Sequence, residues 1–165
     1  MLTVIAKYRR LKITIAALTT MLAAFNANAM EDGEVQAYAG FIQELINTTT
    51  MVKQGVTCTF GSDEIANAIV AQEAKSINLA KNPEKFAQCK AIYVSKGSEK
   101  ILKSEIARFS RNKIMTVAIF DGFAETGGMV QVQMGRRNFE ITLNSKEAKA
   151  SGVRLNALLL SLVIN

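Results

Sequence analysis

Apolar side chains recur every three or four positions in three stretches of the chain, the spacing of an amphipathic helix. The first covers residues 33–47 and should end at the β-branched threonines of 48–50. The second covers 63–74, where Ser62 is predicted as the N-cap residue and two carboxylates follow it. The third covers 99–111. These patterns predict three helices separated by short connections.

Short apolar runs alternate with these helices. Residues 55–60, 76–80 and 91–96 read as strands, and 114–120 is apolar without a break. An unbroken apolar strand is typical of a sheet that is covered on both faces. Strands that alternate with helices of about ten residues favour a parallel sheet. The sequence therefore predicts an α/β fold with a parallel-centred sheet flanked by helices.

The last third of the chain has a different period. Residues 129–134 and 138–143 alternate between apolar and polar side chains, and a turn over 135–138 joins them. Alternation with a period of two, interrupted by a short turn, indicates an antiparallel hairpin. The C-terminal part of the fold should therefore contain a hairpin beside the parallel strands.

Two short helices are predicted after the hairpin. Asn144 can cap a helix over 145–151, and Gly152 stands where a helix commonly ends in a left-handed residue. Asn156 can cap a closing helix over 157–164, which is apolar nearly all round. A helix without a polar face is expected to be buried.

The N-terminal 29 residues have the layout of a secretory signal peptide. Basic residues precede an apolar stretch over 13–25, and small residues at 27–29 offer a cleavage site. A helix of thirteen residues reaches only about 20 Å, whereas the hydrocarbon core measures about 30 Å. The expected organisation is a signal peptide over 1–29 and a single exported domain over 30–165, with an uncleaved N-terminal anchor as the alternative.

The high net charge of the whole chain comes largely from this leader. The chain has 20 Lys and Arg against 14 Asp and Glu, a net charge of +6. Four of these cations lie in the leader, which leaves 16 against 14 and a net charge of +2 for the rest. So small an excess does not indicate a nucleic-acid partner, which requires cations clustered on one face.

Cys58 and Cys89 are the two cysteines of the chain. An even number of cysteines in an oxidising compartment favours one disulfide, and two buried free thiols are the alternative. A bridge that closes a loop of this length would stabilise the fold by about 3–4 kcal/mol.

Catalytic chemistry has few candidates. The chain contains no histidine, which excludes Ser-His and Cys-His nucleophile pairs and imidazole metal sites. The glycine-rich stretch 122–128 leads into a strand and lacks the spacing of a phosphate-binding loop. Asp121 and Glu125 remain as a carboxylate pair, for which solvated loop positions are the favoured interpretation. No catalytic residue, cofactor or metal site is therefore expected.

Several motifs resemble the YfiR-like family of periplasmic proteins over residues 34–164. In the N-terminal half, a cysteine in TCTFG precedes a glycine, and a second cysteine in QCKAIYVSKG precedes a strand. The chain departs from the family where Trp-Pro is replaced by Asn-Thr-Thr-Thr at 47–50, and where a second cysteine pair is absent. The C-terminal half carries the most specific matches: Phe123, Gly127, Gly128, Met129, Phe139, Glu140, Ile141, Gly152 and Leu159.

This resemblance implies a non-enzymatic regulator that binds and represses the periplasmic domain of an inner-membrane diguanylate cyclase. Such repression lowers cyclic di-GMP and with it biofilm and exopolysaccharide output. Related domains serve as sensor modules of membrane kinases, so a sensor kinase is a second partner class, and a periplasmic small-ligand sensor is the alternative function. The resemblance also implies that Cys58 and Cys89 form a disulfide. Insertion into the membrane after cleavage is not expected, and homodimer formation is left open.

Four residues are candidates for contact with a partner or ligand. Phe123 and Met129 flank the glycines of 122–128 and either fill the core or face a partner, with the core favoured because aromatic residues more often pack inward. Glu125 lies in the same loop, and Arg154 begins a corner that is predicted to be exposed.

Overall fold

The computed structural model of the chain describes residues 30–164, so the predicted signal peptide over 1–29 lies outside the described residues, as does Asn165. The side chains of residues 99–103 are also left undescribed. Residues Gly33–Asn165 form one compact unit. The fold and the surfaces below belong to this unit.

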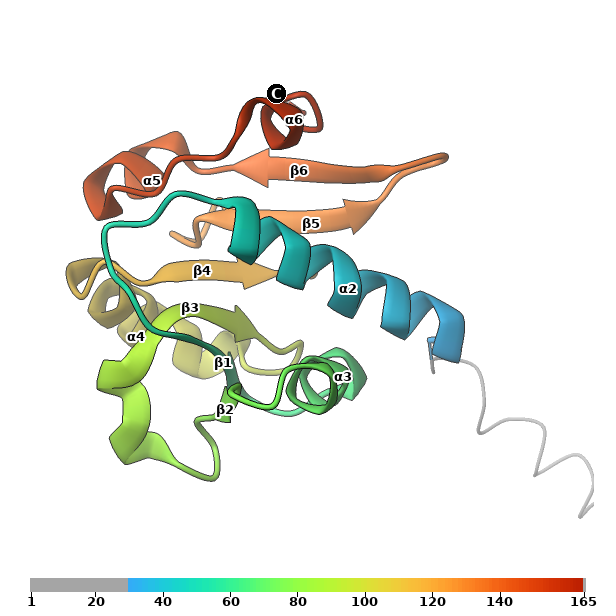
Figure 1. The fold of residues 1–165 in the computed structure, drawn as a ribbon. Helices are drawn as coiled ribbons and strands as arrows, with labels where there is room; N and C mark the ends of the chain where they lie inside the picture. The colour runs from blue at the N-terminus through green and yellow to red at the C-terminus, as the bar shows by residue number, and fades with distance from the viewer. Residues whose placement is uncertain (1–29, 165) are drawn as a thin grey trace, which may run out of the picture. The chain divides into compact units, whose positions relative to one another are not determined.

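A six-stranded mixed sheet lies at the centre of the unit (Figure 1). Its strand order is β2-β1-β3-β4-β5-β6, with β2 to β5 pairing in parallel and β6 antiparallel to β5. The predicted parallel-centred sheet with a C-terminal hairpin is therefore confirmed. The strands are β1 (Val56–Phe60), β2 (Ile77–Asn78), β3 (Cys89–Val94), β4 (Met115–Ala118), β5 (Val130–Met134) and β6 (Phe139–Leu143).

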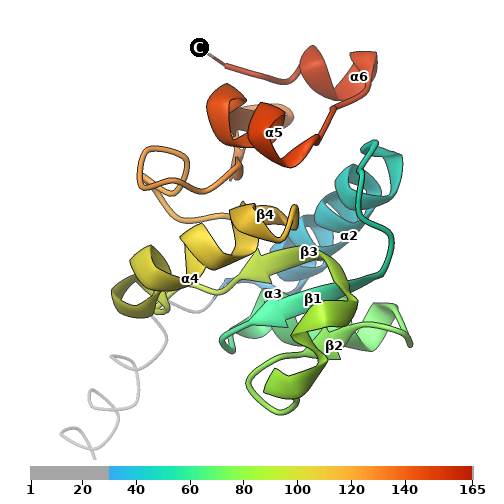
Figure 2. The same cartoon turned by 90° about the vertical axis from the view of Figure 1, so that its left-hand side faces the viewer.

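Helices cover both faces of this sheet. Two of them, α2 and α3, lie on one face and α4 lies on the other (Figures 1 and 2). A 3₁₀ helix, η1, precedes β3, and two short helices follow β6. The bounds are α2 (Asp32–Thr48), α3 (Glu64–Gln72), η1 (Pro83–Gln88), α4 (Glu99–Arg111), α5 (Ser145–Ser151) and α6 (Ala157–Leu160).

The central strands are apolar on both sides because both sides are covered. All four residues of β4 are buried. In β3, Ile92 and Val94 join the core cluster that contains Phe109 of α4. Tyr93, between them, is fully buried and its hydroxyl donates to Asp63 at the start of α3. The continuous apolar pattern of the parallel strands thus has the expected cause.

Three local expectations need correction. The N-cap of α3 is Asp63 and not Ser62, because the Asp63 side chain accepts a hydrogen bond from the Ala66 amide at 2.7 Å. The strand expected over 76–80 is limited to the two residues of β2. The closing helix expected over 157–164 is limited to α6, after which residues near Val163 pair with β6.

The glycine-rich stretch 122–128 belongs to a crossover between two parallel strands. Because β4 and β5 run in parallel, the chain must return across the sheet between them. It does so through consecutive turns without a helix, and Gly127 takes a left-handed φ of 103°. Gly128 lies against Phe123, and a Cβ atom added there would stand 2.3 Å from the ring. The glycines thus allow a compact crossover closed by an aromatic ring.

Candidate interaction surface

The two cysteines form a disulfide between neighbouring parallel strands. Cys58 of β1 and Cys89 of β3 are bonded, with a Cα–Cα distance of 5.7 Å. Both residues are fully buried and belong to the core cluster beneath α4. Phe86 of η1 packs against the same cluster, its ring centroid 5.6 Å from that of Phe109. The bridge is thus part of the core and not of an exposed surface.

Phe123 and Met129, two of the four candidates for partner contact, lie in the core. Each is 0% exposed, and the ring of Phe120 packs edge-on against Phe123 at 5.2 Å between centroids. The amide of Met129 donates to the hydroxyl of Thr116 at 3.0 Å. Neither side chain is at the surface of the protein, so the structure agrees with the interpretation that both fill the core.

Asp121 and Glu125 do not have the surroundings that acid–base catalysis requires. Both residues are exposed. Asp121 accepts a hydrogen bond from the Gln133 side chain, and the Glu125 carboxylate lies near Gly122. General acid–base chemistry needs a sheltered pair of groups, and these two carboxylates face solvent. Among residues 30–164, no group of three or more His, Cys, Asp or Glu side chains could hold a metal ion.

Arg154 is held through its backbone and keeps an exposed side chain. Its amide donates to the carbonyl of Thr50 at 2.9 Å, and the Thr50 amide donates to the Arg154 carbonyl at 3.0 Å. This isolated antiparallel bridge ties the chain after α5 to the loop that follows α2. Glu125 and Arg154 are therefore the two sequence-predicted contact residues that solvent can reach.

The C-terminal segment exposes apolar side chains that the sequence pattern predicted to be buried. Leu158 is 73% exposed, Leu160 51% and Ile164 43%, whereas Leu159 is 4% exposed. The expectation of a buried closing helix is therefore wrong. The reason is local: Asn156 caps only one turn of helix, and a single turn on the edge of a sheet can bury only one of its sides.

The chain after α6 is fixed to the outer edge of β6. The Ile141 amide donates to the Leu162 carbonyl and the Ile164 amide donates to the Ile141 carbonyl, both at 2.9 Å. These bonds satisfy part of the open edge that β6 would otherwise present. They also hold the exposed residues of α6 in place on the sheet.

A groove opens between this segment and the tip of the β5–β6 hairpin. Its volume is about 560 Å³. Two exposed cations, Arg136 and Arg137, stand at the tip. The lining residues are Arg136, Arg137, Asn138, Phe139, Glu140, Ser161, Leu162 and Ile164. We refer to this groove together with Leu158 and Leu160 as the C-terminal surface.

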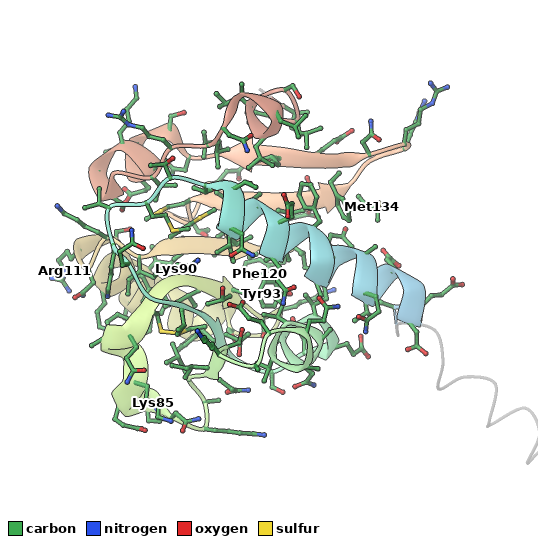
Figure 3. The ribbon with its side chains drawn as sticks, viewed as in Figure 1. Lys85, Lys90, Tyr93, Arg111, Phe120 and Met134 are labelled. Carbon is green, nitrogen blue, oxygen red and sulfur yellow. A yellow bond between two sulfur atoms is a disulfide. The ribbon has the colours of Figure 1, made fainter. Side chains whose placement is uncertain are left out.

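Packing from α2 supports the floor of the groove. Phe139 stacks on Phe41 with ring centroids 4.2 Å apart and meets the edge of Tyr38 at 5.1 Å. The Tyr38 hydroxyl accepts a hydrogen bond from the Met134 amide at 2.8 Å, and burial raises the pKa of this hydroxyl. Figure 3 labels Met134 near the hairpin end, where its side chain is 44% exposed. These contacts attach the hairpin to α2 although it lies at the edge of the sheet.

The C-terminal surface was not found from the sequence. Its residues lie in two stretches, 136–140 and 158–164, that meet only through the pairing of the C-terminal segment with β6. The basic doublet in a predicted hairpin turn and the all-apolar ending were both visible in the sequence. Neither pattern shows that they share a surface.

The chain matches a family of known proteins. A sequence profile of the family described as YfiR/HmsC-like matches residues 46–163. No curated protein matches the chain. No helix among residues 30–164 is long and apolar enough to span a membrane.

Among the solved structures that share the fold is a conserved domain protein from Vibrio cholerae O1 biovar El Tor, with a TM-score of 0.59 and 8% sequence identity. The similarity covers 78% of this chain and 58% of the Vibrio chain, so this chain spans less than two thirds of that protein. At this level of identity the likeness shows the fold alone.

Proposed function

Because the chain belongs to the YfiR/HmsC-like family, we propose that it is a periplasmic regulator that binds the periplasmic domain of an inner-membrane diguanylate cyclase. In this proposal, binding holds the cyclase inactive and lowers cyclic di-GMP and biofilm output. The family is regulatory and acts through partner proteins, which supports a binding role without catalysis. The domain organisation of the proposal is a leader over 1–29 followed by a single binding domain over 30–165.

The observation that carries the proposal is the C-terminal surface. It combines exposed apolar side chains, Leu158 and Leu160, with two arginines at the rim of a groove. Protein interfaces concentrate their binding energy in a few apolar and arginine side chains surrounded by polar residues. We therefore assign partner binding to this surface, with Arg136 and Arg137 facing acidic groups of the cyclase.

Repression follows from a difference in affinity between two states of the partner. A protein that binds the inactive conformation of the cyclase more tightly shifts the population towards it by that ratio of affinities. Moving the partner from 1:99 to 99:1 requires a ratio of about 10⁴. No covalent step is needed, in agreement with the exposed positions of Asp121 and Glu125.

The disulfide gives this regulator a dependence on redox conditions. Reduction of Cys58 and Cys89 would destabilise the fold that positions the C-terminal surface. Loss of the folded state removes the binding surface and releases the cyclase.

The proposal is tested in the host by deletion and complementation. Deleting the gene is expected to raise cellular cyclic di-GMP, and the wild-type chain should restore the low level. A chain with Arg136→Glu and Arg137→Glu should fold normally and fail to restore it. The matched control, Lys81→Glu with Lys96→Glu, makes the same charge change at exposed positions outside the groove and should restore it. An unchanged cyclic di-GMP level after deletion would contradict the proposal.

A second function, sensing of a small anionic ligand, is favoured by the dimensions of the groove. Ligand sites commonly measure 300–1,000 Å³, and this groove of about 560 Å³ has two arginines at its rim. A ligand that binds only the folded state raises the unfolding temperature. A thermal-shift screen of carboxylates and phosphates should then find a stabilising compound whose effect disappears in the Arg136→Glu, Arg137→Glu variant. A screen without such a compound removes this alternative.

A further inference from the structure

Cations gather at the edge of the sheet where the parallel strands begin. Lys53 lies just before β1, Lys90 is the second residue of β3, and Lys113 lies just before β4. Because these strands are parallel neighbours, their first residues lie at one edge. Figure 3 shows Lys85, Lys90 and Arg111 towards this side of the unit. We define the basic edge as Lys53, Lys85, Lys90, Arg108, Arg111, Lys113 and Arg154.

Contacts across the basic edge join its parts. The Phe86 ring of η1 lies beneath both the Arg108 guanidinium, 4.2 Å from the ring centroid, and the Lys53 ammonium, 5.9 Å from it. The Lys90 ammonium is 3.5 Å from the side-chain oxygen of Asn47 at the end of α2.

Little of this positive charge is neutralised within the chain. Among residues 30–164, the ion pair formed at the basic edge joins Arg108 to Glu105 at 3.0 Å. Burial lowers the pKa of Lys53, because desolvation of its ammonium is not offset by a carboxylate. An anion brought to this edge would remove that cost.

Helix electrostatics explain only part of the arrangement. Arg108 and Arg111 occupy the last turn of α4, where the helix dipole favours cations. That argument does not apply to Lys53 or Arg154, which lie outside helices and away from the end of α4 in the sequence.

An apolar side chain accompanies the cations. Val52 precedes Lys53 in the loop after α2 and is 61% exposed. Its methyl groups lie beside Gly152, which precedes Arg154 by two residues. Exposed apolar groups surrounded by lysine and arginine are typical of surfaces that rest on anionic lipid, where headgroup phosphates meet the cations and the apolar group enters the interface.

We propose that the basic edge docks on the phosphates of anionic phospholipids at the membrane surface. This docking rests on the periplasmic location proposed above, but not on repression of a cyclase. Basic residues near an anionic bilayer add to its attraction for a protein, and the attraction decays within a Debye length. Docking would orient the unit with its strand beginnings on the membrane and concentrate it where a membrane-bound partner lies.

The test measures binding of the protein, purified from its host, to vesicles. Vesicles containing phosphatidylglycerol mixed with phosphatidylcholine are compared with pure phosphatidylcholine by flotation at low and high salt. The protein is expected to float with the anionic vesicles at low salt and to be released by high salt. The variant Lys53→Glu, Lys90→Glu, Arg111→Glu should bind at least about a hundredfold more weakly, since each cation contributes close to one factor of five.

A charge-matched control separates the edge from net charge. The variant Lys96→Glu, Arg136→Glu, Arg137→Glu carries the same change at residues away from the basic edge and should bind anionic vesicles nearly as well as the wild type. Equal binding to both lipid compositions would overturn the proposal, and so would equal losses in the two triple variants. If the wild type ignores vesicles while the basic-edge variant loses repression in the host, the edge contacts an acidic protein and the lipid proposal fails.

The two proposals can fail independently. If the variant Lys96→Glu, Arg136→Glu, Arg137→Glu binds vesicles but does not repress the cyclase, the result supports lipid docking by the basic edge and partner binding by the C-terminal surface. If the purified protein binds vesicles but gene deletion leaves cyclic di-GMP unchanged, lipid docking is retained and the proposed function fails.

Discussion

Two regions of the sheet, one around β1 and β3 and the other at β6, differ in how their apolar residues are covered. Around β1 and β3, a disulfide, α4 and η1 enclose a cluster in which Cys58, Cys89 and Phe109 are fully buried. Around β6, the covering element is the four-residue α6, which leaves Leu158 and Leu160 largely exposed. The first region stabilises the fold, and the second leaves apolar side chains exposed at the surface to which we assign partner binding. Substitutions should therefore affect stability in the first region and binding in the second.

The largest expected effect is loss of the disulfide. Cys58 and Cys89 are 31 residues apart in sequence, and opening a loop of that length should lower the free energy of unfolding by about 3–4 kcal/mol. Urea unfolding with and without reductant measures this difference. The variant Cys58→Ala, Cys89→Ala serves as the control, since reductant should leave its midpoint unchanged. A loss below about 1 kcal/mol would mean that the enclosed cluster does not depend on the bridge.

A second large effect is expected at Asp63, the residue that joins β1, α3 and the loop after β3. Its carboxylate accepts hydrogen bonds from the Ala66 amide at 2.7 Å, the Tyr93 hydroxyl at 3.0 Å and the Lys96 amide at 3.0 Å. Asp63→Ala should lower stability by about 3 kcal/mol, because it removes a helix cap and leaves a buried hydroxyl unpaired.

Asp63→Asn is the matched control for this prediction. Asparagine caps helices as well as aspartate does, and its amide nitrogen can donate to the Tyr93 hydroxyl, so only the Lys96 amide loses its acceptor and the loss measured by chemical unfolding should be clearly smaller. Equal losses in the two variants would show that the second carboxylate oxygen matters more than the helix cap.

The crossover between β4 and β5 should be sensitive to one added methyl group. A Cβ atom at Gly128 would stand 2.3 Å from the buried Phe123 ring, so Gly128→Ala should cost about 2 kcal/mol of stability through overpacking. At Gly40, within α2, a Cβ atom would have no neighbour within 4 Å. Gly40→Ala should therefore stabilise the protein by about 0.5–1 kcal/mol. Thermal unfolding of both variants measures the change in unfolding temperature. The prediction fails if Gly128→Ala and Gly40→Ala change this temperature in the same direction.

Sequence patterns predicted the long helices and the central strand better than the C-terminal segment. Helical spacing identified α2 and α4, because a helix buried on one face has a clear periodicity, and a continuous apolar run identified β4. The crossover over 122–128 was missed because no local pattern shows that β5 pairs with β4 in parallel. The exposure of α6 was missed because a segment apolar on every side gives no indication of which side is covered.

Alkaline pH should weaken the region around Tyr93. Burial, reinforced by the negative charge of Asp63, raises the pKa of the Tyr93 hydroxyl above its ordinary value of about 10. The unfolded chain then loses this proton above pH 10 while the folded chain keeps it. Stability is full below pH 10 and falls as the pH rises, by about 1.4 kcal/mol at pH 11 for this group.

The difference between the wild type and Tyr93→Phe isolates this effect. Unfolding measured from pH 8 to 11 should show a smaller alkaline loss in the variant, because phenylalanine does not titrate. Tyr38, whose pKa burial also raises, is present in both proteins and cancels. Parallel pH profiles would mean that the pKa of Tyr93 is the same in the folded and the unfolded chain.

The smallest effect on stability, and the sharpest test of the comparison, is expected at α6. Leu158 and Leu160 are 73% and 51% exposed, so Leu158→Ser with Leu160→Ser removes little buried apolar area and should change stability by less than about 0.5 kcal/mol. The same change should abolish repression of the cyclase in the host, because interface side chains contribute only when a partner covers them. Ala71→Ser with Ala107→Ser, at exposed positions of α3 and α4, is the control and should repress normally. A Leu158→Ser, Leu160→Ser protein that unfolds as the wild type does and still represses would show that the partner binds elsewhere. One that unfolds much more easily would show that α6 belongs to the core of the fold after all.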